Sequence, residues 1–454
     1  MGEEKLGVEE MKQRAEIPAK KAPGWHAFYR GKIETTLKCA VTDVSDFGIW
    51  YTPGVAAPCR EIEADQSKVF EYTNKANTVA VVSDGSRVLG LGNIGPHAGL
   101  PVMEGKALLF KYLGGVGAFP IMLDTQDPEE IIQAVKWIAP GFGGVNLEDF
   151  ANPKCFYILD RLREELEIPV WHDDQQGTAS ITLAGVINAL KVVDKDMNRV
   201  TYCVIGTGSA NVAFVRILLS AGVPAGNVIM VDSKGILHPG REDLEKDQDK
   251  NPYKWHYAQV TNAEHRSGDM ADAIAGSDVL IAASKPGPGT IKQEWLQAMN
   301  KDAIAFIMAN PTPEIWPWEA KEAGVRIVGT GRSDFPNQVN NSLGFPAIFR
   351  GVLDVQAKTI TDEMAIAAAQ EIALYAEERG IDEDHIMPTM GDWELFPREA
   401  VAVALKAQEQ GVARLDLAQD ELFRRAEARI QHARDMTKYL MEKGLIPPMP
   451  ADVG

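Results

Sequence analysis

The alternation of apolar and polar positions divides the chain into three regions, of which the middle one is the most regular. Between about residues 196 and 355, short apolar runs alternate with stretches whose apolar residues recur at helical spacing. The five runs are VTYCVIG (200–206), NVIMVD (227–232), DVLIAAS (278–284), AIAFIMAN (303–310) and VRIVGTG (325–331). Strands that alternate with helices are typical of a parallel sheet with crossover helices, so the pattern predicts a doubly wound α/β domain.

The regions on either side have different patterns. Residues 1 to about 195 mix helical stretches with short apolar runs that Gly and Pro interrupt, which indicates a second α/β domain. Beyond about residue 356 the pattern is helical, with one predicted helix capped by Thr361 and stopped by Gly380. We therefore expect domains at 1–195, 196–355 and 356–454, the last being a helical segment that packs on the other two.

Composition and charge narrow the class of protein. The chain has 454 residues, of which 45% are hydrophobic and 24% are charged, as in globular proteins. Its formal net charge of -18 argues against nucleic acid as a partner, because phosphate binding depends on clustered Lys and Arg. No apolar run reaches the roughly 18 residues of a bilayer span, so we expect no membrane partner.

The N-terminus and the cysteines indicate the compartment. The first residues, MGEEKLGVEEMKQ, lack the basic and apolar segments of a secretory signal. Four cysteines, Cys39, Cys59, Cys155 and Cys203, lie far apart without C-x-x-C spacing. We expect reduced thiols that pack as small core residues in a cytoplasmic protein.

A glycine-rich turn after the first run of the middle region predicts nucleotide binding. GTGSAN follows a predicted strand and opens a predicted helix, with Asn211 in place of the last Gly of G-x-G-x-x-G. Gly206 and Gly208 permit a tight turn and a close approach of pyrophosphate, whose charge is favoured by the N-terminus of the helix that follows. Ser209, in the same turn, is also expected to contact the cofactor. The region is therefore predicted to be a Rossmann-like dinucleotide-binding domain, the alternative being a similar turn that binds no nucleotide.

The second strand of this unit indicates which dinucleotide binds. It ends at Asp232, where a carboxylate accepts from the ribose hydroxyl of NAD⁺ and repels the 2′-phosphate of NADP⁺. Lys234 follows shortly after and softens that repulsion. We expect NAD⁺ to be preferred, with some use of NADP⁺.

A second stretch, GLGNIG (90–95), lies in the first region and matches the G-x-G-x-x-G pattern at every position. Pro96 and Pro101 follow it and are expected to prevent an immediate long helix. The nearest acid at the end of an apolar run, Asp124, is too far along the chain to serve the ribose. We interpret these glycines as positions where the backbone approaches a small ligand or packs closely.

Two acidic pairs stand at the ends of apolar runs in the first region. Glu148 and Asp149 follow one run, and Asp173 and Asp174 follow another. If both runs are strands that face one cleft, the carboxylates form an all-oxygen site that suits Mg²⁺ or Mn²⁺ rather than Zn²⁺. His172 is either a further ligand or, as the neighbouring carboxylates favour, a supporting residue, and helix capping is the alternative role for the second pair.

Six stretches, in this order, resemble the motifs of malic enzymes of the shorter bacterial and archaeal type. They are YTPGVAAPCREI (51–62), SDGSRVLGLGNIG (83–95), MEGKALLFK (103–111), NLEDF (146–150), HDDQQGTA (172–179) and GRSDFPNQVNNSLGFPAIFRG (331–351). The resemblance implies oxidative decarboxylation of L-malate to pyruvate and CO₂, with reduction of NAD(P)⁺ and a divalent metal. Asn93, where the family usually has Asp, His97 and Asn211 depart from the pattern.

The resemblance also implies roles for single residues. The implied metal ligands are Glu148, Asp149 and Asp174. Lys106 takes the hydroxyl proton of malate and Asp173 orients it from behind, while Arg87 clamps a malate carboxylate. Tyr51 protonates enolpyruvate at carbon. Taken singly, Lys106 would be a solvated helix lysine and Tyr51 a core aromatic.

The resemblance also implies that residues of the middle region contact the substrate and the cofactor. Asn310 and Asn341 resemble the amides that touch malate and the nicotinamide end of the cofactor, and Asn340 is the weaker candidate of its pair. The loop that begins at Ser284 resembles one that lies beside the dinucleotide. The family implies a homodimer or a multiple of it, and leaves open whether Tyr51 serves its own subunit or a neighbour.

Other functions stay open at this point. The same scaffold serves a malolactic enzyme or an oxaloacetate decarboxylase that retains its cofactor. A nucleotide-binding regulatory protein would need no intact site, and an amino-acid dehydrogenase also uses a Lys in a Gly-rich loop but needs no acid cluster.

Overall fold

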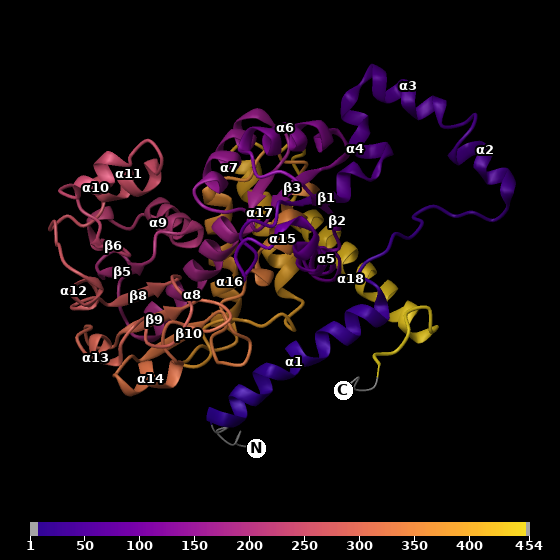
Figure 1. The fold of residues 1–454 in the computed structure, drawn as a ribbon. Coiled ribbons are helices and arrows are strands. Elements are labelled where there is room, and N and C mark those ends of the chain that lie inside the picture. The colour runs from indigo at the N-terminus through magenta and orange to yellow at the C-terminus, as the bar shows by residue number, and fades with distance from the viewer. Residues whose placement is uncertain (1–7, 451–454) are drawn as a thin grey trace.

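The computed structural model describes residues 8–450, which form two sheets surrounded by helices (Figure 1). One sheet takes four strands from the first region and the other takes six strands from the middle region. The α/β fold class is confirmed. Within residues 8–450, no helix combines the length and the apolar character needed to cross a membrane.

The four-stranded sheet is parallel throughout and has the order β2-β1-β3-β4. Its central strand β1 is apolar except at its ends and is buried along its whole length, as expected for a parallel strand covered on both faces. The strands are β1 (Thr78–Ser83), β2 (Gly117–Met122), β3 (Gly144–Leu147) and β4 (Val170–His172). The helices are α4 (Val69–Tyr72), α5 (Gly95–Gly114), α6 (Pro128–Ile138), α7 (Lys154–Glu165) and α8 (Thr178–Val192).

The six-stranded sheet has the order β10-β9-β8-β5-β6-β7. All five predicted runs form its parallel strands: β5 (Tyr202–Ile205), β6 (Val228–Asp232), β8 (Val279–Ala282), β9 (Ile304–Ile307) and β10 (Ile327–Thr330). The sequence missed the antiparallel edge strand β7 (Gly235–Ile236), because so short a strand has no periodicity. The helices are α9 (Ser209–Ser220), α10 (Glu242–Lys246), α11 (Pro252–Val260), α12 (Met270–Ile274), α13 (Gln293–Leu296) and α14 (Pro317–Glu322).

Alternate residues of these strands pack into two different cores. In β5, Tyr202 and Val204 join a large core with α8 and α9, whereas Cys203 and Ile205 join a smaller core with α12, α13 and α14. Helices therefore cover both faces of the sheet, which confirms the doubly wound arrangement.

Four helices follow the second sheet: α15 (Phe345–Asp354), α16 (Asp362–Glu378), α17 (Leu395–Glu409) and α18 (Gln419–Glu442). As predicted, Thr361 caps α16 by accepting from the Met364 N–H at 3.2 Å, and Gly380 follows its end with a φ of 90°. Helices α15, α16 and α17 contribute to the large core, which also takes residues from both sheets (Figure 1). This shared core joins the two sheets.

One carboxyl group in this core has no partner. Glu399, on α17, is fully buried, and neither of its oxygens has a hydrogen-bond partner among the described residues. Burial, with a smaller effect from Glu371, raises the pKa of Glu399 well above its usual value of 4.5. The folded protein therefore binds this proton more tightly than the unfolded chain, and stability is lost as the pH rises from 4.5 through the folded-state pKa.

We expect Glu399→Gln to raise the Tm by about 3 °C or more near pH 8 and to change it little near pH 5, because glutamine has no charge to bury. Thermal unfolding followed by circular dichroism at both pH values measures this. Glu409→Gln, at the exposed end of the same helix, is the matched control. An equal shift at both pH values would contradict the assignment.

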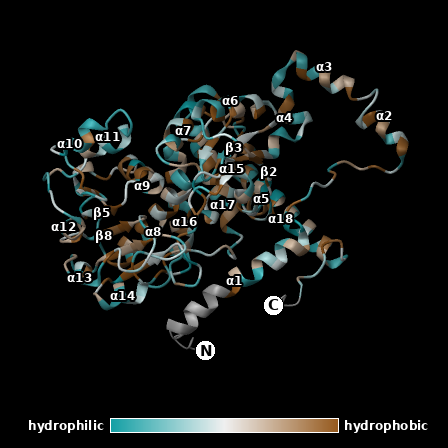
Figure 2. Ribbon diagram, viewed as in Figure 1, coloured by the Kyte–Doolittle hydropathy of each residue, from teal (hydrophilic) through white to brown (hydrophobic). Residues whose placement is uncertain are grey.

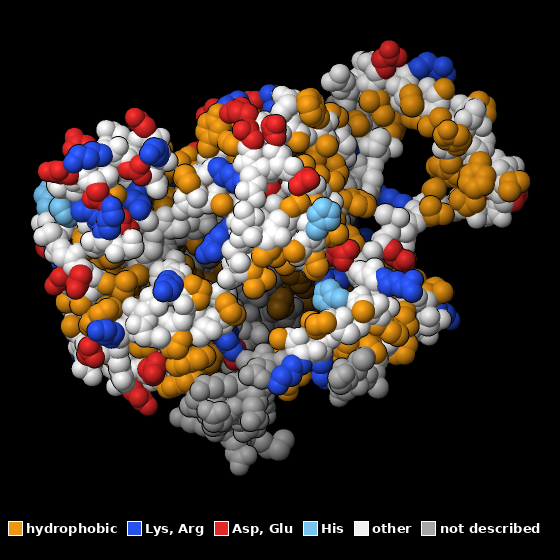
Figure 3. Space-filling view, viewed as in Figure 1, with side chains coloured by type: hydrophobic (Ala, Val, Ile, Leu, Met, Phe, Trp, Pro, Cys, Tyr) orange, Lys and Arg blue, Asp and Glu red, His pale blue; other side chains and the backbone are white. Residues whose placement is uncertain are grey.

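Residues 34–67, here called the arm, project from the body after α1 (Val8–Tyr29) and carry α2 (Phe47–Trp50) and α3 (Ala56–Ala64) (Figure 1). No residue of the arm is buried. Hydrophobic residues recur along it (Figure 2), and their side chains gather on its surface (Figure 3). The large exposed ones are Leu37, Val41, Val44, Phe47, Ile49, Trp50, Tyr51 and Val55. An apolar surface of this extent is typical of a contact with another molecule.

Two sequence-based expectations are wrong in part. Cys155 and Cys203 are buried as predicted, but Cys39 and Cys59 are exposed on the arm, a placement that composition does not reveal. Helix α5 begins at Gly95, the last residue of GLGNIG, in spite of its prolines. Pro96 lies in the first turn, where an N–H would have no helical partner, and Pro101 removes only one further bond from a helix of 20 residues.

Candidate active site

The carboxyl ends of β3 and β4 meet at one edge of the four-stranded sheet. The two strands are parallel neighbours, and Leu147, the last residue of β3, pairs with His172, the last residue of β4. The acidic pairs that follow, 148–149 and 173–174, therefore leave the sheet side by side. In open α/β sheets this is the edge at which ligands bind.

Glu148, Asp149 and Asp174 form a compact group of carboxylates. One oxygen of each lies within 4.8 Å of the others. The backbone N–H of Asp149 donates to Asp174 Oδ2 at 2.8 Å, and Asp149 adopts a left-handed conformation with a φ of 59°. One oxygen of this residue, Oδ2, is buried without a partner among the described residues.

The electrostatics of the group favour a bound cation. Burial, and next the charge of Asp174, raise the pKa of Asp149 to about 8. Burial also raises the pKa of Glu148, although Lys106 opposes the shift. Carboxylates crowded in this way are stabilised as anions by positive charge. Three oxygen ligands within reach of one another fit a hard divalent cation such as Mg²⁺ or Mn²⁺.

His172 lies beside this group without being part of it. Its Nδ1 is 3.6 Å from Asp174 Oδ2, and neither ring nitrogen has a hydrogen-bond partner among the described residues. Burial lowers the pKa of His172 to about 3, so the imidazole is neutral. This placement fits a supporting role better than that of a ligand.

Lys106 reaches the same edge from α5. Its Nζ lies 2.5 Å from Asp173 Oδ2, 2.9 Å from Glu148 Oε1 and 4.3 Å from the centre of the Phe345 ring. The side chain is 8% exposed, so the alternative of a solvated helix lysine is wrong. Burial lowers the pKa of Lys106, but the carboxylates of Asp173 and Glu148 outweigh it and hold that pKa above its ordinary value.

Asp173 is held from two further directions. Trp171 Nε1 donates to its Oδ1 at 3.0 Å, and Asn341 Nδ2 donates to its Oδ2 at 2.5 Å. Asp173 also opens a single π-helical turn (Asp173–Gly177), a feature that is frequent at functional sites. Sequence analysis did not predict that Trp171 contacts Asp173 or that Phe345 contacts Lys106. The only indication was that each is an aromatic residue close to a motif.

Arg87 lies on the loop that follows β1, and its backbone N–H donates to the Asp149 carbonyl at 2.9 Å. Its side chain is exposed and has no hydrogen bond or ion pair with any described residue. The loop is fixed by buried Asp84, whose Oδ2 pairs with Lys154 Nζ at 2.5 Å. A free guanidinium on a fixed loop suits a substrate carboxylate.

The GTGSAN turn lies between β5 and α9, where nucleotide binding was predicted. Gly206 has a φ of 102°, a conformation that glycine favours, and Gly208 precedes α9, which begins at Ser209. Asn211 is buried, and its Nδ2 donates at 2.7 and 3.1 Å to the carbonyls of Ile205 and Gly206. The asparagine thus ties the helix to the end of the strand, in place of the close packing that a third glycine provides.

Asp232 ends β6 as predicted, but its carboxylate is already engaged. Arg241 and Lys254 both pair with it, and the backbone N–H of Lys234 donates to its Oδ1 at 2.9 Å. The Lys234 ammonium turns instead to Asp243, at 2.9 Å. The sequence missed Arg241 and Lys254, because they lie in a charged stretch that has no motif.

Ser284 and Asn310 lie on two loops that Glu314 joins. Buried Glu314 accepts from the N–H and hydroxyl of Ser284 at 2.7 and 3.0 Å, and from the Ala309 N–H at 3.2 Å. Asn310 is exposed, and a Cβ at Gly90 would come within 2.5 Å of its carbonyl oxygen. Close packing is therefore one role of the GLGNIG glycines. Sequence analysis did not identify Glu314 as a site residue, because an acidic residue after a strand is also typical of a turn.

Tyr51 is not brought to this edge within the chain. It lies on the arm and is 72% exposed, so the alternative of a core aromatic is wrong. Its N–H donates to the Phe47 carbonyl at 2.8 Å. The described residues thus bring together the four acids at 148–149 and 173–174 with Lys106 and Asn341, but not with Tyr51.

Two family models match most of the chain. "Malic enzyme, N-terminal domain" matches residues 30–163, and "Malic enzyme, NAD binding domain" matches residues 175–408. The chain belongs to the malic enzyme family. This confirms the resemblance, the assignment as an enzyme and the nicotinamide cofactor.

Individual relatives agree with the family models. The chain is 48% identical over 397 residues to a bifunctional malic/malolactic enzyme of Bacillus subtilis, covering 87% of this chain and 95% of that one. It is 52% identical over 386 residues to an NAD-dependent malic enzyme of Geobacillus stearothermophilus, covering 85% and 78%. The structure of an Entamoeba histolytica malic enzyme superposes with a TM-score of 0.94 at 46% identity, covering 98% and 93%.

Family membership decides between several of the earlier alternatives. A malic enzyme is an oxidoreductase that decarboxylates malate with a nicotinamide cofactor, as predicted. The alternatives of a regulatory nucleotide-binding protein and an amino-acid dehydrogenase are set aside. The roles of single residues and the metal remain predictions.

Proposed function

We propose that the chain converts L-malate and NAD⁺ to pyruvate, CO₂ and NADH at the edge of the four-stranded sheet, with a divalent cation held by Glu148, Asp149 and Asp174. The observation that carries this proposal is the group of three carboxylates directly beside the buried Lys106–Asp173 pair. A divalent cation supplies Lewis acidity that makes the malate hydroxyl more acidic.

The residues of the chain bind the substrate and move its protons. Arg87 pairs with a malate carboxylate, and Asn310 and Asn341 donate to the substrate and the nicotinamide end of the cofactor. Lys106 accepts the hydroxyl proton while the carbon-bound hydrogen leaves with its electron pair as hydride. When CO₂ departs, the bonding electron pair remains on carbon, and Tyr51 protonates that carbon.

Lys106 needs a neutral amine for this step. Asp173 fixes the position of its Nζ, and Glu148 is the second carboxylate that keeps it charged. A cation held by Glu148 would offset the charge of that carboxylate, which would favour loss of the proton from Lys106. Asp173 then remains as the residue that orients the amine.

We propose that the chain forms a homodimer, or a multiple of it, in which the arm contacts a second copy. The arm has no buried residue and carries eight large exposed hydrophobic side chains between positions 37 and 55. Burial of such a surface against a partner stabilises the assembly. Because Tyr51 lies on the arm, we infer that it serves the site of the neighbouring subunit.

Three further properties belong to this proposal. NAD⁺ is the better cofactor because the negative charge of Asp232 repels a 2′-phosphate, and NADP⁺ is also used because Lys254 and Arg241 partly offset that charge. The dinucleotide lies along the GTGSAN turn, at Gly206, Gly208, Ser209 and Asn211, and beside the loop at Ser284. A cytoplasmic location is supported by four cysteines that form no disulfide.

We further infer that the chain is divided into the three domains predicted from sequence, 1–195, 196–355 and 356–454. One sheet lies in the first segment and the other in the second. Helices α16, α17 and α18 lie in the third and pack on both others.

The test is malate-dependent NADH formation with purified protein, with and without Mn²⁺. We expect activity with Mn²⁺, none after EDTA, and at least about a 100-fold lower kcat in Asp149→Asn, which removes one ligand charge. Glu164→Gln, an exposed acid on α7, is the matched control. Turnover that survives EDTA, or lactate formed without release of NADH, would overturn the proposal.

A further inference from the structure

Asn310 begins the turn that follows β9, and the proposed function gives its amide a contact with malate and with the nicotinamide. The residue is exposed, and its amide forms no hydrogen bond with any described residue. Such an amide aids a reaction only if the surrounding structure keeps it in the right place. The position of Asn310 therefore depends on what holds this turn.

Arg332 holds the turn from the neighbouring strand. It lies two residues beyond the end of β10, the parallel neighbour of β9, and its Nη1 donates to the Pro311 carbonyl at 2.7 Å. Pro311 directly follows Asn310 in the chain. The guanidinium also lies 5.9 Å from the ring centre of Trp316, further along the same segment. One side chain thus contacts this segment at two points.

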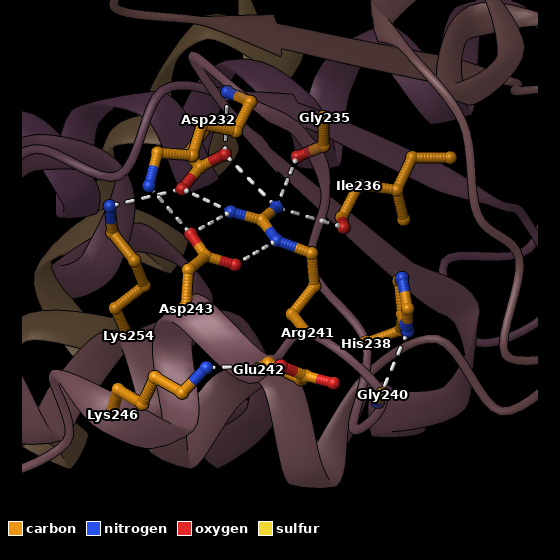
Figure 4. Close-up of polar contacts among 11 residues, drawn as sticks. Asp232, Gly235, Ile236, His238, Gly240, Arg241, Glu242, Asp243, Lys246 and Lys254 are labelled. Atoms are coloured by element: carbon orange, nitrogen blue, oxygen red, sulfur yellow. Dashed lines mark hydrogen bonds and ion pairs between the residues drawn. The ribbon is translucent and has the colours of Figure 1, made fainter.

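Asp334 fixes the orientation of this guanidinium. Arg332 Nε and Nη2 lie 2.8 Å from Asp334 Oδ1 and 2.8 Å from Asp334 Oδ2, which is a two-pronged pair. Arg241 forms the same pair with Asp243, also two residues further along the chain, and its Nη1 likewise donates to backbone carbonyls, those of β7 (Figure 4). In both places the carboxylate orients the arginine so that Nη1 holds a nearby segment of backbone.

Two glycines pack closely against Asn310. A Cβ at Gly331, next to Arg332, would come within 2.9 Å of Asn310 Nδ2, and a Cβ at Gly90 would come within 2.5 Å of the Asn310 carbonyl oxygen. Gly90 belongs to the first sheet's loop and Gly331 to a loop of the second sheet. A shift of the turn between these loops therefore displaces the amide.

We propose that Arg332 is a positioning residue, which holds the Pro311 carbonyl and thereby keeps the Asn310 amide where malate and the nicotinamide meet. Arg332 acts through Asn310 and does not itself contact the substrate. This inference rests on the proposed function, which assigns the amide of Asn310 to the substrate and the cofactor. An amide that is already in place costs no ordering when the substrate binds.

The test is a double-mutant cycle of Arg332→Met and Asn310→Ala, measured as kcat/KM for malate with NAD⁺ and Mn²⁺. With Asn310 present, we expect Arg332→Met to lower kcat/KM at least about tenfold, because the displaced amide loses its hydrogen bond to the substrate. In the Asn310→Ala background the same change is expected to cost less than about twofold, since no amide is left to position. A general loss of fold would lower kcat/KM equally in both backgrounds.

Arg326→Met is the matched control. Arg326 directly precedes β10, at the opposite edge of the sheet, and pairs with Asp302 and Glu383. Its kcat/KM is expected to stay within about twofold of the wild type. Asp334→Asn is a second variant that keeps the guanidinium but weakens the pair that orients it. We expect a loss of about threefold that also disappears in the Asn310→Ala background, so this variant carries the test if Arg332→Met does not fold.

Cofactor binding gives a second readout that needs no turnover. Calorimetric titration of the proteins of the cycle with NAD⁺ is compared with titration with ADP-ribose, which lacks the nicotinamide. With Asn310 present, we expect Arg332→Met to raise the Kd of NAD⁺ at least about threefold and to leave that of ADP-ribose unchanged. In the Asn310→Ala background neither Kd is expected to respond to Arg332→Met.

Coupling between Arg332 and Asn310 in either readout supports the inference. Equal losses in the two backgrounds, or no loss, in both readouts would overturn it, because Arg332 would then contact the ligand directly or serve only the fold. Wild-type protein that shows the coupling in NAD⁺ binding but does not oxidise malate refutes the proposed function and keeps the inference. Protein that oxidises malate without any coupling refutes the inference and keeps the function.

Discussion

Lys106→Met is expected to lower the kcat for malate oxidation by about 10³- to 10⁴-fold, because it removes the proposed general base and leaves no other amine at the site. The dinucleotide turn between β5 and α9 lies on the other sheet, so cofactor binding is expected to persist. Steady-state kinetics and calorimetric titration with NAD⁺ measure the two properties on the same sample. Thermal unfolding shows that the variant is folded.

The matched control is Lys111→Met, the same substitution at an exposed position on the same helix. It is expected to keep kcat within about twofold of the wild type, as surface substitutions away from a site usually do. A Lys106→Met variant that retains a tenth or more of the activity, or that loses NAD⁺ binding together with turnover, would argue against Lys106 as the base.

Mixed dimers of Tyr51→Phe and Lys106→Met are expected to recover about half of the wild-type activity, although each variant alone is nearly inactive. If Tyr51 serves the neighbouring subunit, a mixed dimer has one site with both residues changed and one site with both intact. Co-expression of the two variants with different affinity tags, followed by purification over both, isolates this species. Malate-dependent NADH formation is then compared with the parent dimers.

The design separates the two arrangements of Tyr51. If Tyr51 acted within its own subunit, each site of the mixed dimer would lack one residue, and activity would stay at the level of the parents. Co-expressed Tyr51→Phe carrying both tags is the control for assembly and purification. A protein that is monomeric by light scattering would refute the proposed dimer directly.

The chemistry of the site was readable in the sequence to a large degree. All five β runs of the middle region form strands, and the GTGSAN turn joins β5 to α9, because strand periodicity and turn chemistry are local properties. The two acidic pairs were visible as polar residues at the ends of apolar runs. The motifs that resemble malic enzymes led to the correct family, since six ordered stretches together carry more information than any one of them.

Other features depended on long-range contacts. Prolines after GLGNIG were expected to prevent an immediate long helix, but the first turn of α5 accommodates Pro96, because that position needs no N–H donor. Asp232 was expected to accept from a ribose hydroxyl, and the structure shows that it also pairs with Arg241 and Lys254, which follow it in a stretch without a motif. Neither partner is identifiable from spacing.

The sequence by itself determined the fold class, the family and the types of residue at the site, because each of these is encoded in short segments. Only the tertiary structure decided which of those residues meet. The parallel register of β3 and β4 brings the two acidic pairs together, and the packing of α5 buries Lys106 between Asp173 and Glu148. The projection of the arm carries Tyr51 away from them. Register and packing are set by contacts between residues far apart along the chain, and no local pattern records them.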